Sequence, residues 1–260
     1  MGAPYSFTFQ RTEVKYRIPA DRYEEFRKEM DPYIGLDAYG LSTICNIYYD
    51  TEDRKLITRS LAKPAYKEKL RLRSYGIPKA DSTVFPELKK KVEGVVYKRR
   101  CAMTLQEAEA FLNRREMPSE NGQVQKELAY ARDFYGLRPA LFLAYDREAF
   151  VGRQDPEMRM TIDRRIRFRE DHLSLSEGDG GEELDLNGDY LLEVKVNGAL
   201  PLPIVRIFNH LGIYPASFSK YGAVYTELMG RNRLRETARQ RQSAKAPVLR
   251  PAYGRYALQA

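Results

Sequence analysis

Residues 67–76 have the sequence KEKLRLRSYG, and the fold depends on how this stretch is interpreted. As a strand it alternates between two faces, one formed by Lys67, Lys69, Arg71 and Arg73 and the other by Glu68, Leu70, Leu72 and Ser74. Two like charges 5 Å apart repel by about 3 kcal/mol at an effective dielectric constant of 20. A row of four cations therefore indicates either a solvated face or a site for an anion.

The composition is that of a basic globular chain. Its 260 residues are 43% hydrophobic, which suits one large domain or two small ones. Lys and Arg exceed Asp and Glu, so the formal net charge is +8. Acidic partners such as phosphates, nucleic acid or an anionic membrane are all compatible with this charge.

Cysteine and histidine are too few for several kinds of site. Cys45 and Cys101 form neither a CxxC pair nor a disulfide framework, which favours free thiols and a cytoplasmic location. With only His172 and His210, a zinc site or histidine-based nucleophilic catalysis is not expected, and any metal is expected to have oxygen ligands. No segment approaches the roughly 18 to 20 apolar residues that a membrane span needs, so we expect a soluble protein.

Hydrophobic periodicity predicts strands with helices inserted between them. The expected strands are 7–18, 42–50, 67–75, 83–94, 95–103, 140–152, 158–170 and 190–198. The expected helices are 19–30, 52–61, 104–116, 123–136, 202–212 and 218–229. Thr104 and Glu107 have the spacing of a capping box. Residues 177–189, rich in Glu, Gly and Asp, are expected to be a mobile surface loop.

The strong strands share one design, with an apolar face for helices to cover and a charged face opposite. The charged faces carry Arg11, Lys15, Arg17, Lys67, Lys69, Arg71, Arg73, Lys89, Lys91, Arg147, Arg159, Arg165, Arg167 and Lys195. Solvated faces usually mix both signs, because like charges directly opposite each other are destabilising. If the sheet closes into a barrel, these cations meet around a lumen where a polyanion offsets their repulsion. An open face in water is the alternative.

Few acids share these faces, namely Glu13, Glu87, Asp163 and Glu193. Carboxylate oxygens suit Mg²⁺ or Mn²⁺, which also bridge phosphate oxygens. Salt bridges with the surrounding cations are the alternative for each of them, and Asp163 is a candidate to support an arginine. Arg17, Arg165 and Arg167 are alternatively solvated cations near the mouth of a tunnel.

Nine short motifs occur in an order that resembles a known family. They are RTEVKYRI, IYYDT, KLRLRSYG, ELKKK, YKRR, YDREAF, MRMTIDRRI, LLEVKV and SFSKYG, between about residues 7 and 228. The order is similar to that of the VTC domain, the polyphosphate polymerase module of the CYTH or triphosphate tunnel superfamily. The resemblance implies an α+β fold, a closed eight-stranded antiparallel β-barrel with helices packed on the outside. It also implies binding of triphosphate and polyphosphate.

The resemblance, together with the charged faces, gives a set of expected site residues. The expected catalytic residues are Arg71, Arg73, Lys89, Arg147, Arg159 and Lys220. The expected substrate-binding residues are Lys15, Lys91, Lys98, Lys195 and Ser219. The expected ligands of Mn²⁺ or Mg²⁺ are Glu193, Glu13 and Glu87. Ser219 is alternatively only a helix cap.

Two departures from the family pattern matter. The superfamily opens with two alternating glutamates and a lysine, whereas this chain has Arg11, Glu13 and Lys15, which weakens a two-metal hydrolytic site. The regulatory SPX domain and the membrane helices of the eukaryotic polymerases are not found in the sequence, so passage of polymer across a membrane would need a separate membrane protein.

We therefore expect a tunnel domain at 1–230 and a basic tail at 231–260. The expected function is that of a phosphotransferase, a polyphosphate polymerase that moves the γ-phosphate of ATP or another NTP to polyphosphate. A metal-dependent tripolyphosphate or nucleotide phosphohydrolase and a non-catalytic receptor for polyphosphate or an inositol phosphate are the alternatives. Nucleic acid is not an expected partner, because the cations have strand spacing and no ribonucleoprotein motif is evident.

Overall fold

A computed structural model describes residues 11–93, 95–119 and 121–245 of the chain. The chain divides into two compact units, residues 1–223 and 224–260. In the second unit the described part is the continuation of the last helix, in which Arg231 pairs with Glu227 one turn away. That helix ends at Lys245, well beyond the predicted end at residue 229. The predicted boundary at 230 stays a prediction, and residues 246–260 of the predicted tail lie outside the described residues.

The first unit is built on one antiparallel sheet of ten strands. The strands are β1 (Arg11–Ile18), β2 (Ile34–Asp50), β3 (Tyr66–Tyr75), β4 (Thr83–Val92), β5 (Val95–Arg100), β6 (Met103–Thr104), β7 (Arg138–Gly152), β8 (Arg159–Arg169), β9 (Glu182–Glu183) and β10 (Tyr190–Asn197). Eight of them follow the order β1-β10-β8-β7-β2-β3-β4-β5, with β6 added on β4 and β9 on β8. Each predicted strand has a counterpart, although residues 7–10 of the first lie outside the described residues.

The prediction of a closed eight-stranded barrel is wrong, because the sheet is open and has ten strands. Within the described ranges, β1 and β5 are the two ends of the path and no pairing joins them. The outer edge of β1 is already used by a later segment, since Tyr16 bridges Pro215 and the amide of Ala216 donates to the carbonyl of Lys15 at 2.7 Å. This segment occupies the edge that a closing strand would need.

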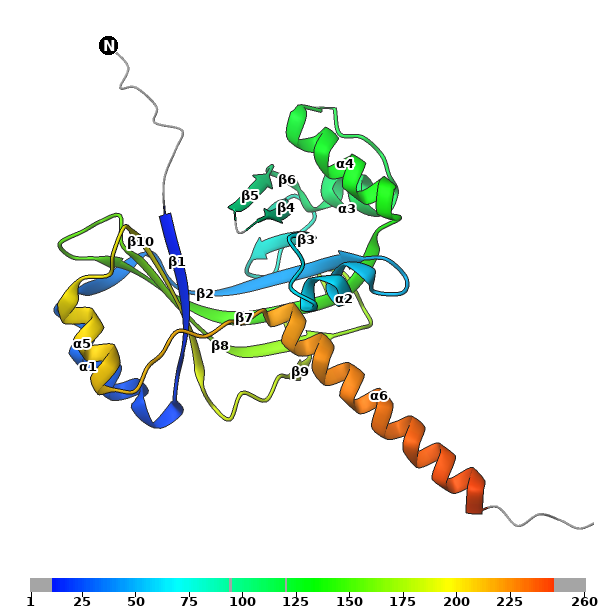
Figure 1. Cartoon of the computed structure of the whole chain (residues 1–260). Helices are drawn as coiled ribbons and strands as arrows, with labels where there is room; N and C mark the ends of the chain where they lie inside the picture. Colours follow the sequence, from blue (N-terminus) through cyan, green and yellow to red (C-terminus); the bar gives the residue numbers. More distant parts are fainter. Residues whose placement is uncertain (1–10, 94, 120, 246–260) are drawn as a thin grey trace, which may run out of the picture. The chain divides into compact units, whose positions relative to one another are not determined.

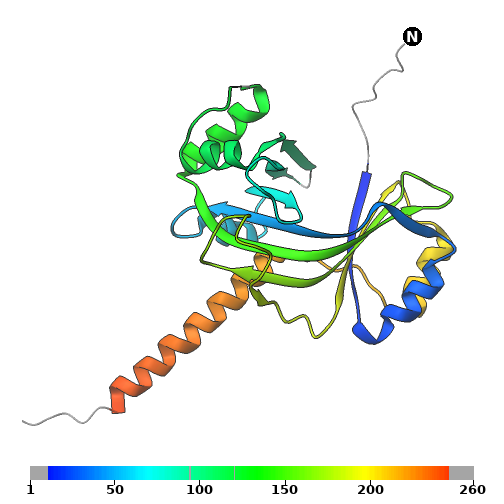
Figure 2. The same cartoon turned by 180° about the vertical axis from the view of Figure 1, so that it is seen from behind.

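The described helices are η1 (Ala20–Arg22), α1 (Tyr23–Met30), α2 (Lys55–Leu61), α3 (Leu105–Asn113), α4 (Gln123–Tyr135), α5 (Leu202–His210) and α6 (Lys220–Lys245). Those that cover the apolar side of the sheet form two groups (Figures 1 and 2). α1 and α5 run side by side over one end of the sheet, and α3 and α4 lie over the other. The predicted capping box at the start of α3 is confirmed, with Thr104 and Glu107 bonded to each other's amides.

Two buried clusters join these helices to the strands. In one, Phe26 of α1 and Phe208 of α5 pack with Tyr16, Ile162 and Val194. In the other, α3 and α4 pack on β2, β3, β4 and β7 through residues that include Phe111, Leu128, Leu70 and Phe142. The apolar faces predicted for the strands thus form the core.

A bulge in β8 changes which face its second half presents. Arg165 has a left-handed backbone with φ 48°, and the β7–β8 register shifts between Ala144 and Asp146. A one-residue shift moves the following side chains to the other face. Arg167 therefore stands opposite Ala144, a core residue, and binds Asp146 and Asp179. The prediction that Arg167 shares a face with Arg159 and Asp163 is wrong.

The segment predicted as a mobile loop is fastened to the sheet by two arginines. Arg169 donates to the backbone carbonyls of Gly178 and Gly180 at 3.2 and 2.7 Å. Arg167 donates to the carbonyl and the carboxylate of Asp179, both at 3.0 Å. These bonds give the loop a fixed course, which its polar composition did not indicate.

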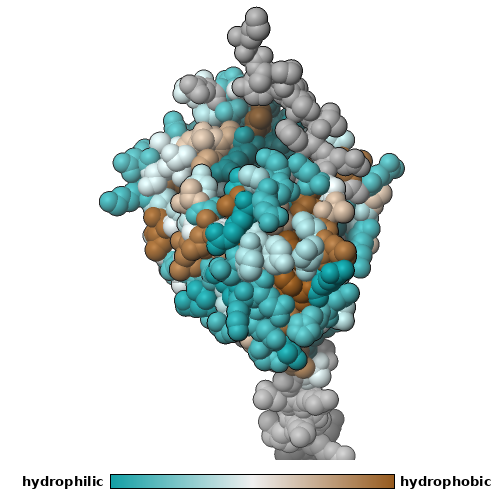
Figure 3. Space-filling view, turned by 90° about the vertical axis from the view of Figure 1, so that its left-hand side faces the viewer, coloured by the Kyte–Doolittle hydropathy of each residue, from teal (hydrophilic) through white to brown (hydrophobic). Residues whose placement is uncertain are grey.

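The surface over α1 and α5 is mainly hydrophilic, with separate hydrophobic groups (Figure 3).

Cys45 is buried, Cys101 is half-buried, and both thiols are free. Among the helices of the described residues, none combines the length and the apolar character needed to span a membrane.

Candidate functional site

The sheet face opposite the two buried clusters, here called the inner face, carries rows of charged residues. Strand register fixes these rows, since residues directly opposite each other share a face. On β3, β4 and β5 the rows are Lys67 with Lys91, Lys69 with Lys89 and Lys98, and Arg71 with Glu87 and Arg100. On β1, β10, β8 and β7 they are Glu13 with Lys195 and Arg159, Lys15 with Glu193 and Thr161, and Asp163 with Arg147.

The row of Lys69, Lys89 and Lys98 places three cations directly opposite one another. Within the part of the chain that the structure describes, Lys69 and Lys89 make no ion pair, while Lys98 binds Glu87 at 2.8 Å. Burial is the main reason why the pKa of Lys69 is lowered to about 8. Partial burial also lowers the pKa values of Lys89 and Lys98, although both residues stay exposed to water, the Lys98 side chain by 44%. Two of the three cations in this row, Lys69 and Lys89, therefore lack an ion-pair partner within the described residues.

Glu87 holds the neighbouring arginine in place. Its side chain is 2% exposed and lies 2.6 Å from Nη2 of Arg71 and 2.8 Å from Nζ of Lys98. Arg73 and Arg100 approach it at 4.0 and 3.6 Å. Burial raises the pKa of Glu87, but the surrounding cations outweigh burial and lower the pKa to about 2. The carboxylate is therefore ionised and surrounded by cations.

Inner-face side chains of β2 and β7 orient the two arginines of β3. Arg73 is buried and donates to Oδ1 of Asn46 at 3.0 Å and to the hydroxyl of Tyr145 at 3.3 Å. Arg71 donates to the hydroxyl of Tyr48 at 3.4 Å. Burial raises the pKa of Tyr48, but Arg71 and its neighbouring cations outweigh burial and lower the pKa to about 8.

Asp163 holds Arg147 and Lys220 in place, as Glu87 holds Arg71. Arg147 binds its carboxylate with two hydrogen bonds of 2.6 and 2.8 Å. Lys220, at the start of α6, lies 2.5 Å from the same carboxylate. Burial raises the pKa of Asp163, but Lys220 and Arg147 outweigh burial and lower the pKa to about 2. Asp163 therefore supports an arginine, the alternative to a metal ligand.

The third carboxylate group lies on β10 and β1. Nζ of Lys195 is 2.7 Å from Glu193 and 3.9 Å from Glu13, and Lys15 is 3.9 Å from Glu193. Burial raises the pKa of Glu193, but Lys195 and Lys15 outweigh burial and lower the pKa to about 2. Beside Glu193, the hydroxyl of Thr161 is buried and has no hydrogen-bond partner among the residues that the structure describes.

The segment before α6 enters the inner face from the side. Nζ of Lys69 donates to Oγ of Ser219 at 2.8 Å, and Nζ of Lys15 donates to the carbonyl of Phe218 at 3.2 Å. Oγ of Ser219 also accepts the amide of Gly222 at 3.2 Å, so Ser219 caps α6. Tyr221 anchors the first turn by donating to the buried Asp50 at 3.0 Å.

The two ends of the open sheet still come close through their side chains. The pKa of Lys89, on β4, responds to Glu13 and Lys15, both on β1. Lys69 and Lys15 both bind the segment at residues 218–219, although they lie on strands from opposite halves of the path. Side chains from both halves of the sheet therefore share one site without a closing strand pair.

Most of the predicted site residues lie on the inner face, and a few are less well placed. Arg159 stands opposite Lys195 and is exposed, and Lys91 stands opposite Lys67. Sequence reasoning left several inner-face residues out of the predicted site, namely Lys69, Tyr48, Asn46, Tyr145 and Arg100. Strand alternation with Arg71 signalled Lys69, and alternation with Arg147 placed Tyr145 on a charged face, but nothing local signalled Tyr48.

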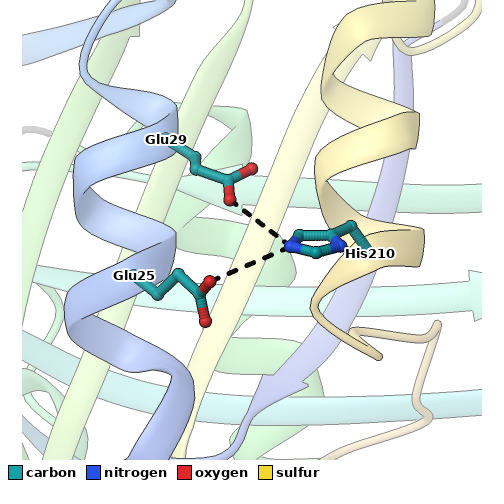
Figure 4. A group of neighbouring side chains, drawn as sticks. All are labelled: Glu25, Glu29 and His210. Carbon is teal, nitrogen blue, oxygen red and sulfur yellow. Dashed lines mark ion pairs between the residues drawn. The ribbon is translucent and has the colours of Figure 1, made fainter.

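The three predicted metal ligands do not form one group. Glu87 is surrounded by cations, whereas Glu193 and Glu13 share Lys195 and offer carboxylate oxygens of the type that Mg²⁺ or Mn²⁺ binds. Among the residues described, the compact group with metal-ligand chemistry is elsewhere, formed by Glu25 and Glu29 of α1 and His210 of α5 (Figure 4). Nε2 of His210 is 3.8 Å from each carboxylate.

Comparison with known proteins adds the following. The family model of the VTC domain matches residues 10–229. No match was found among curated proteins. A candidate adenylate cyclase from Bacillus halodurans is a similar solved structure, with 17% identity and a TM-score of 0.51 over 80% of this chain and 92% of that one. A candidate adenylyl cyclase from Hippeastrum with a dominant triphosphatase activity has 13% identity and a TM-score of 0.44, over 83% and 95%. At 17% identity, the likeness to the Bacillus halodurans structure concerns the fold alone.

Proposed function

The chain belongs to the VTC domain family, and from this premise we propose that it transfers the γ-phosphate of ATP or another NTP onto polyphosphate. The observation that carries the proposal is the row of Lys69, Lys89 and Lys98, directly opposite one another and short of counterions. Such a row is destabilising without an anion and becomes stabilising with one. It runs beside a second row built on Arg71, about 7 Å away along the strand. Together the rows suit a linear polyanion with a charge on every unit.

The arginines of β3 are suited to stabilise the negative charge that develops during phosphoryl transfer. Such transfer needs in-line positioning and fixed cations more than covalent help. Arg71 and Arg73 are held by Glu87, Asn46 and Tyr145, so they present donors with little freedom. The terminal phosphate of the acceptor chain is already ionised, so no general base is required to activate it.

Arg147 and Lys220 are proposed to bind the transferring group from the other side. Asp163 fixes both cations and leaves part of each side chain free for substrate, since each is 17% exposed. Arg159 and Lys91 are proposed to contact the polymer farther along the same face, and Lys98 is proposed to contact it beside Lys89. When substrate enters, Lys15 and Lys195 are proposed to give up their ion pairs with Glu193 and to bind phosphate instead.

A divalent metal fits Glu193 and Glu13 better than Glu87. The carboxylates of Glu193 and Glu13 both reach Lys195, a cation that a metal could replace. Mn²⁺ or Mg²⁺ would supply charge neutralisation on phosphate oxygens when bound. Glu87 is proposed to orient Arg71 and Lys98, because both already bind it at short distance.

Incubation of the protein with ATP, a short polyphosphate and Mn²⁺ or Mg²⁺ tests this function. We expect polyphosphate longer than the added primer as the product. Release of phosphate from ATP as orthophosphate alone would indicate hydrolysis instead. Tight binding with no turnover in either metal would indicate a receptor.

Cytoplasmic location and a separate membrane protein that passes the polymer onward stay predictions.

Two variants connect the activity to the site. Arg71→Ala is expected to weaken substrate binding, because a fixed guanidinium on the inner face is lost. Glu193→Ala is expected to lower mainly the rate. Lys79→Ala, in the exposed turn after β3, is the control. Equal activity in Arg71→Ala, Glu193→Ala and the unaltered protein would contradict the proposed site.

A further inference from the structure

Lys69 and Ser219 form a pair with the geometry of a base and a nucleophile. Nζ of Lys69 lies 2.8 Å from Oγ of Ser219, and the two residues come from β3 and from the cap of α6. Such a distance allows a proton to pass between the two atoms. Both side chains are half-buried on the inner face, so a bound triphosphate could reach Ser219.

A second donor acts on the same hydroxyl. The amide of Gly222 donates to Oγ of Ser219 at 3.2 Å, and free amides at the first turn of a helix favour negative charge. An alkoxide that develops on Oγ would therefore be stabilised by a donor other than Lys69. Helix capping and nucleophilic attack use the same arrangement, so the cap does not argue against a chemical role.

We propose that Ser219 is a phosphoryl acceptor, with Lys69 as the base that takes its hydroxyl proton. The inference rests on the proposed function, because the donor is the same nucleoside triphosphate. Oγ attacks the γ-phosphorus and forms a new P–O bond, while the bond from that phosphorus to the β,γ-bridging oxygen breaks. The nucleoside diphosphate leaves with the electron pair, and the hydroxyl proton moves to the lone pair of Nζ on a neutral Lys69.

The product gives the polymerase its own first acceptor. Phosphoserine at position 219 presents ionised phosphate oxygens inside the cationic site. A second transfer onto one of these oxygens would form a diphosphate ester, and repetition would give a chain anchored to the protein. Synthesis could then begin without an added primer.

The surroundings of Lys69 favour the neutral amine that this step needs. Its pKa is lowered to about 8, mainly by burial. The charged or titratable groups that act on it are Tyr48, Lys67, Lys15 and Lys89. The three lysines lower its pKa further, and Tyr48 opposes them. The neutral fraction of a group with this pKa rises about tenfold between pH 7 and pH 9.

The test follows label from the γ-phosphate of ATP into the full-length protein, with Mn²⁺ and with a short polyphosphate present in a parallel reaction. Peptide mapping by mass spectrometry is expected to find phosphate on Ser219. Ser219→Ala is expected to lose this label, whereas Ser82→Ala, a serine in the β3–β4 turn, is expected to keep it. Lys69→Arg keeps the positive charge but has no usable neutral form, so its labelling is expected to be about a hundredfold slower.

The possible outcomes separate this inference from the function on which it rests. Extension of the added polyphosphate with no label on Ser219 would overturn the acceptor and leave the polymerase. Neither extension nor label would overturn both. Labelling of Lys69→Arg at the unaltered rate, or a labelling rate that falls from pH 7 to pH 9, would overturn the role of Lys69.

Discussion

Glu87, on β4, is the residue on which the arrangement of the neighbouring cations of β3 and β5 depends. It is buried, ionised and in contact with Arg71 and Lys98. Taking away one partner of a buried ion pair usually costs more than the pair contributes, because the other charge is left without compensation. The stability of the apoprotein and the geometry of the site are therefore linked at this position.

We predict that Glu87→Gln lowers the free energy of unfolding by about 3 kcal/mol at pH 7. The folded pKa of about 2 lies below the ordinary 4.5, so this contribution is present above pH 4.5 and is lost as the pH falls toward 2. Urea unfolding between pH 7 and pH 3 is expected to show a smaller pH dependence in the variant. Glu116→Gln, at an exposed pair, is the control. An unchanged midpoint at pH 7 would contradict the prediction.

The lowered pKa of Lys69 predicts that ligand binding is coupled to proton uptake. A bound polyanion raises the pKa of an adjacent ammonium group, so a lysine with a pKa of about 8 takes up protons when tripolyphosphate binds at pH 8.5. Tyr48, whose pKa is also about 8, adds uptake of the same sign. Calorimetry in two buffers of different ionisation enthalpy measures this uptake. Lys69→Arg is expected to reduce it, and Lys79→Arg is the control. Equal uptake in Lys69→Arg and the unaltered protein would disprove the assignment.

At the scale of the elements, the end of β2 fastens two helices at once. Asp50 accepts the amides of Leu56 and Ile57 at the start of α2, at 2.9 and 3.0 Å. It also accepts the hydroxyl of Tyr221, in the first turn of α6. This buried residue therefore positions Ser219 and Lys220 through its bond to Tyr221.

We predict that Asp50→Asn lowers both the stability of the protein and the rate of phosphoryl transfer. An amide then replaces the carboxylate that accepts hydrogen bonds from α2 and Tyr221. Thr104→Ala removes the cap of α3 and is expected to cost about 1 kcal/mol of stability. Since α3 lies on the opposite side of the sheet, transfer per folded molecule should stay unchanged in Thr104→Ala. Thermal melts and single-turnover rates compare the two. A normal rate in Asp50→Asn would show that Asp50 does not position the start of α6.

At the scale of the whole sheet, cations from separate strands act as one charge cluster. Lys89, Lys15 and Lys69 influence one another although β1 and β4 do not pair. Partly buried charges such as that of Lys69 are screened less by salt than fully exposed charges. The site should therefore bind polyanions with a strength that grows with their length.

We predict that tripolyphosphate raises the melting temperature more than orthophosphate does, and that the increase shrinks as NaCl is raised from 0.05 to 0.5 M. Several ion pairs form on binding, and salt weakens each of them. Differential scanning fluorimetry over this salt range measures the effect. Lys89→Ala with Lys98→Ala is expected to flatten the salt dependence, and Lys79→Ala with Lys63→Ala is the matched control. A salt-independent shift would argue against an electrostatic site.

The sequence by itself determined the strand pattern, the capping box of α3 and the sign of the inner face. These features are local, because strand alternation repeats every two residues and a cap needs only four. It missed the first part of β2, where the pairing with β7 is irregular between Leu36 and Leu41 and the alternation is interrupted.

Only the tertiary structure decided the rest. It set the register that aligns Lys69 with Lys89 and Lys98, the bulge that turns Arg167 away, and the segment at Pro215 that keeps the sheet open. It also brought Ser219 to Lys69 from 150 residues away. Each of these depends on contacts between distant segments, and a single inserted residue or one occupied edge changes which side chains meet.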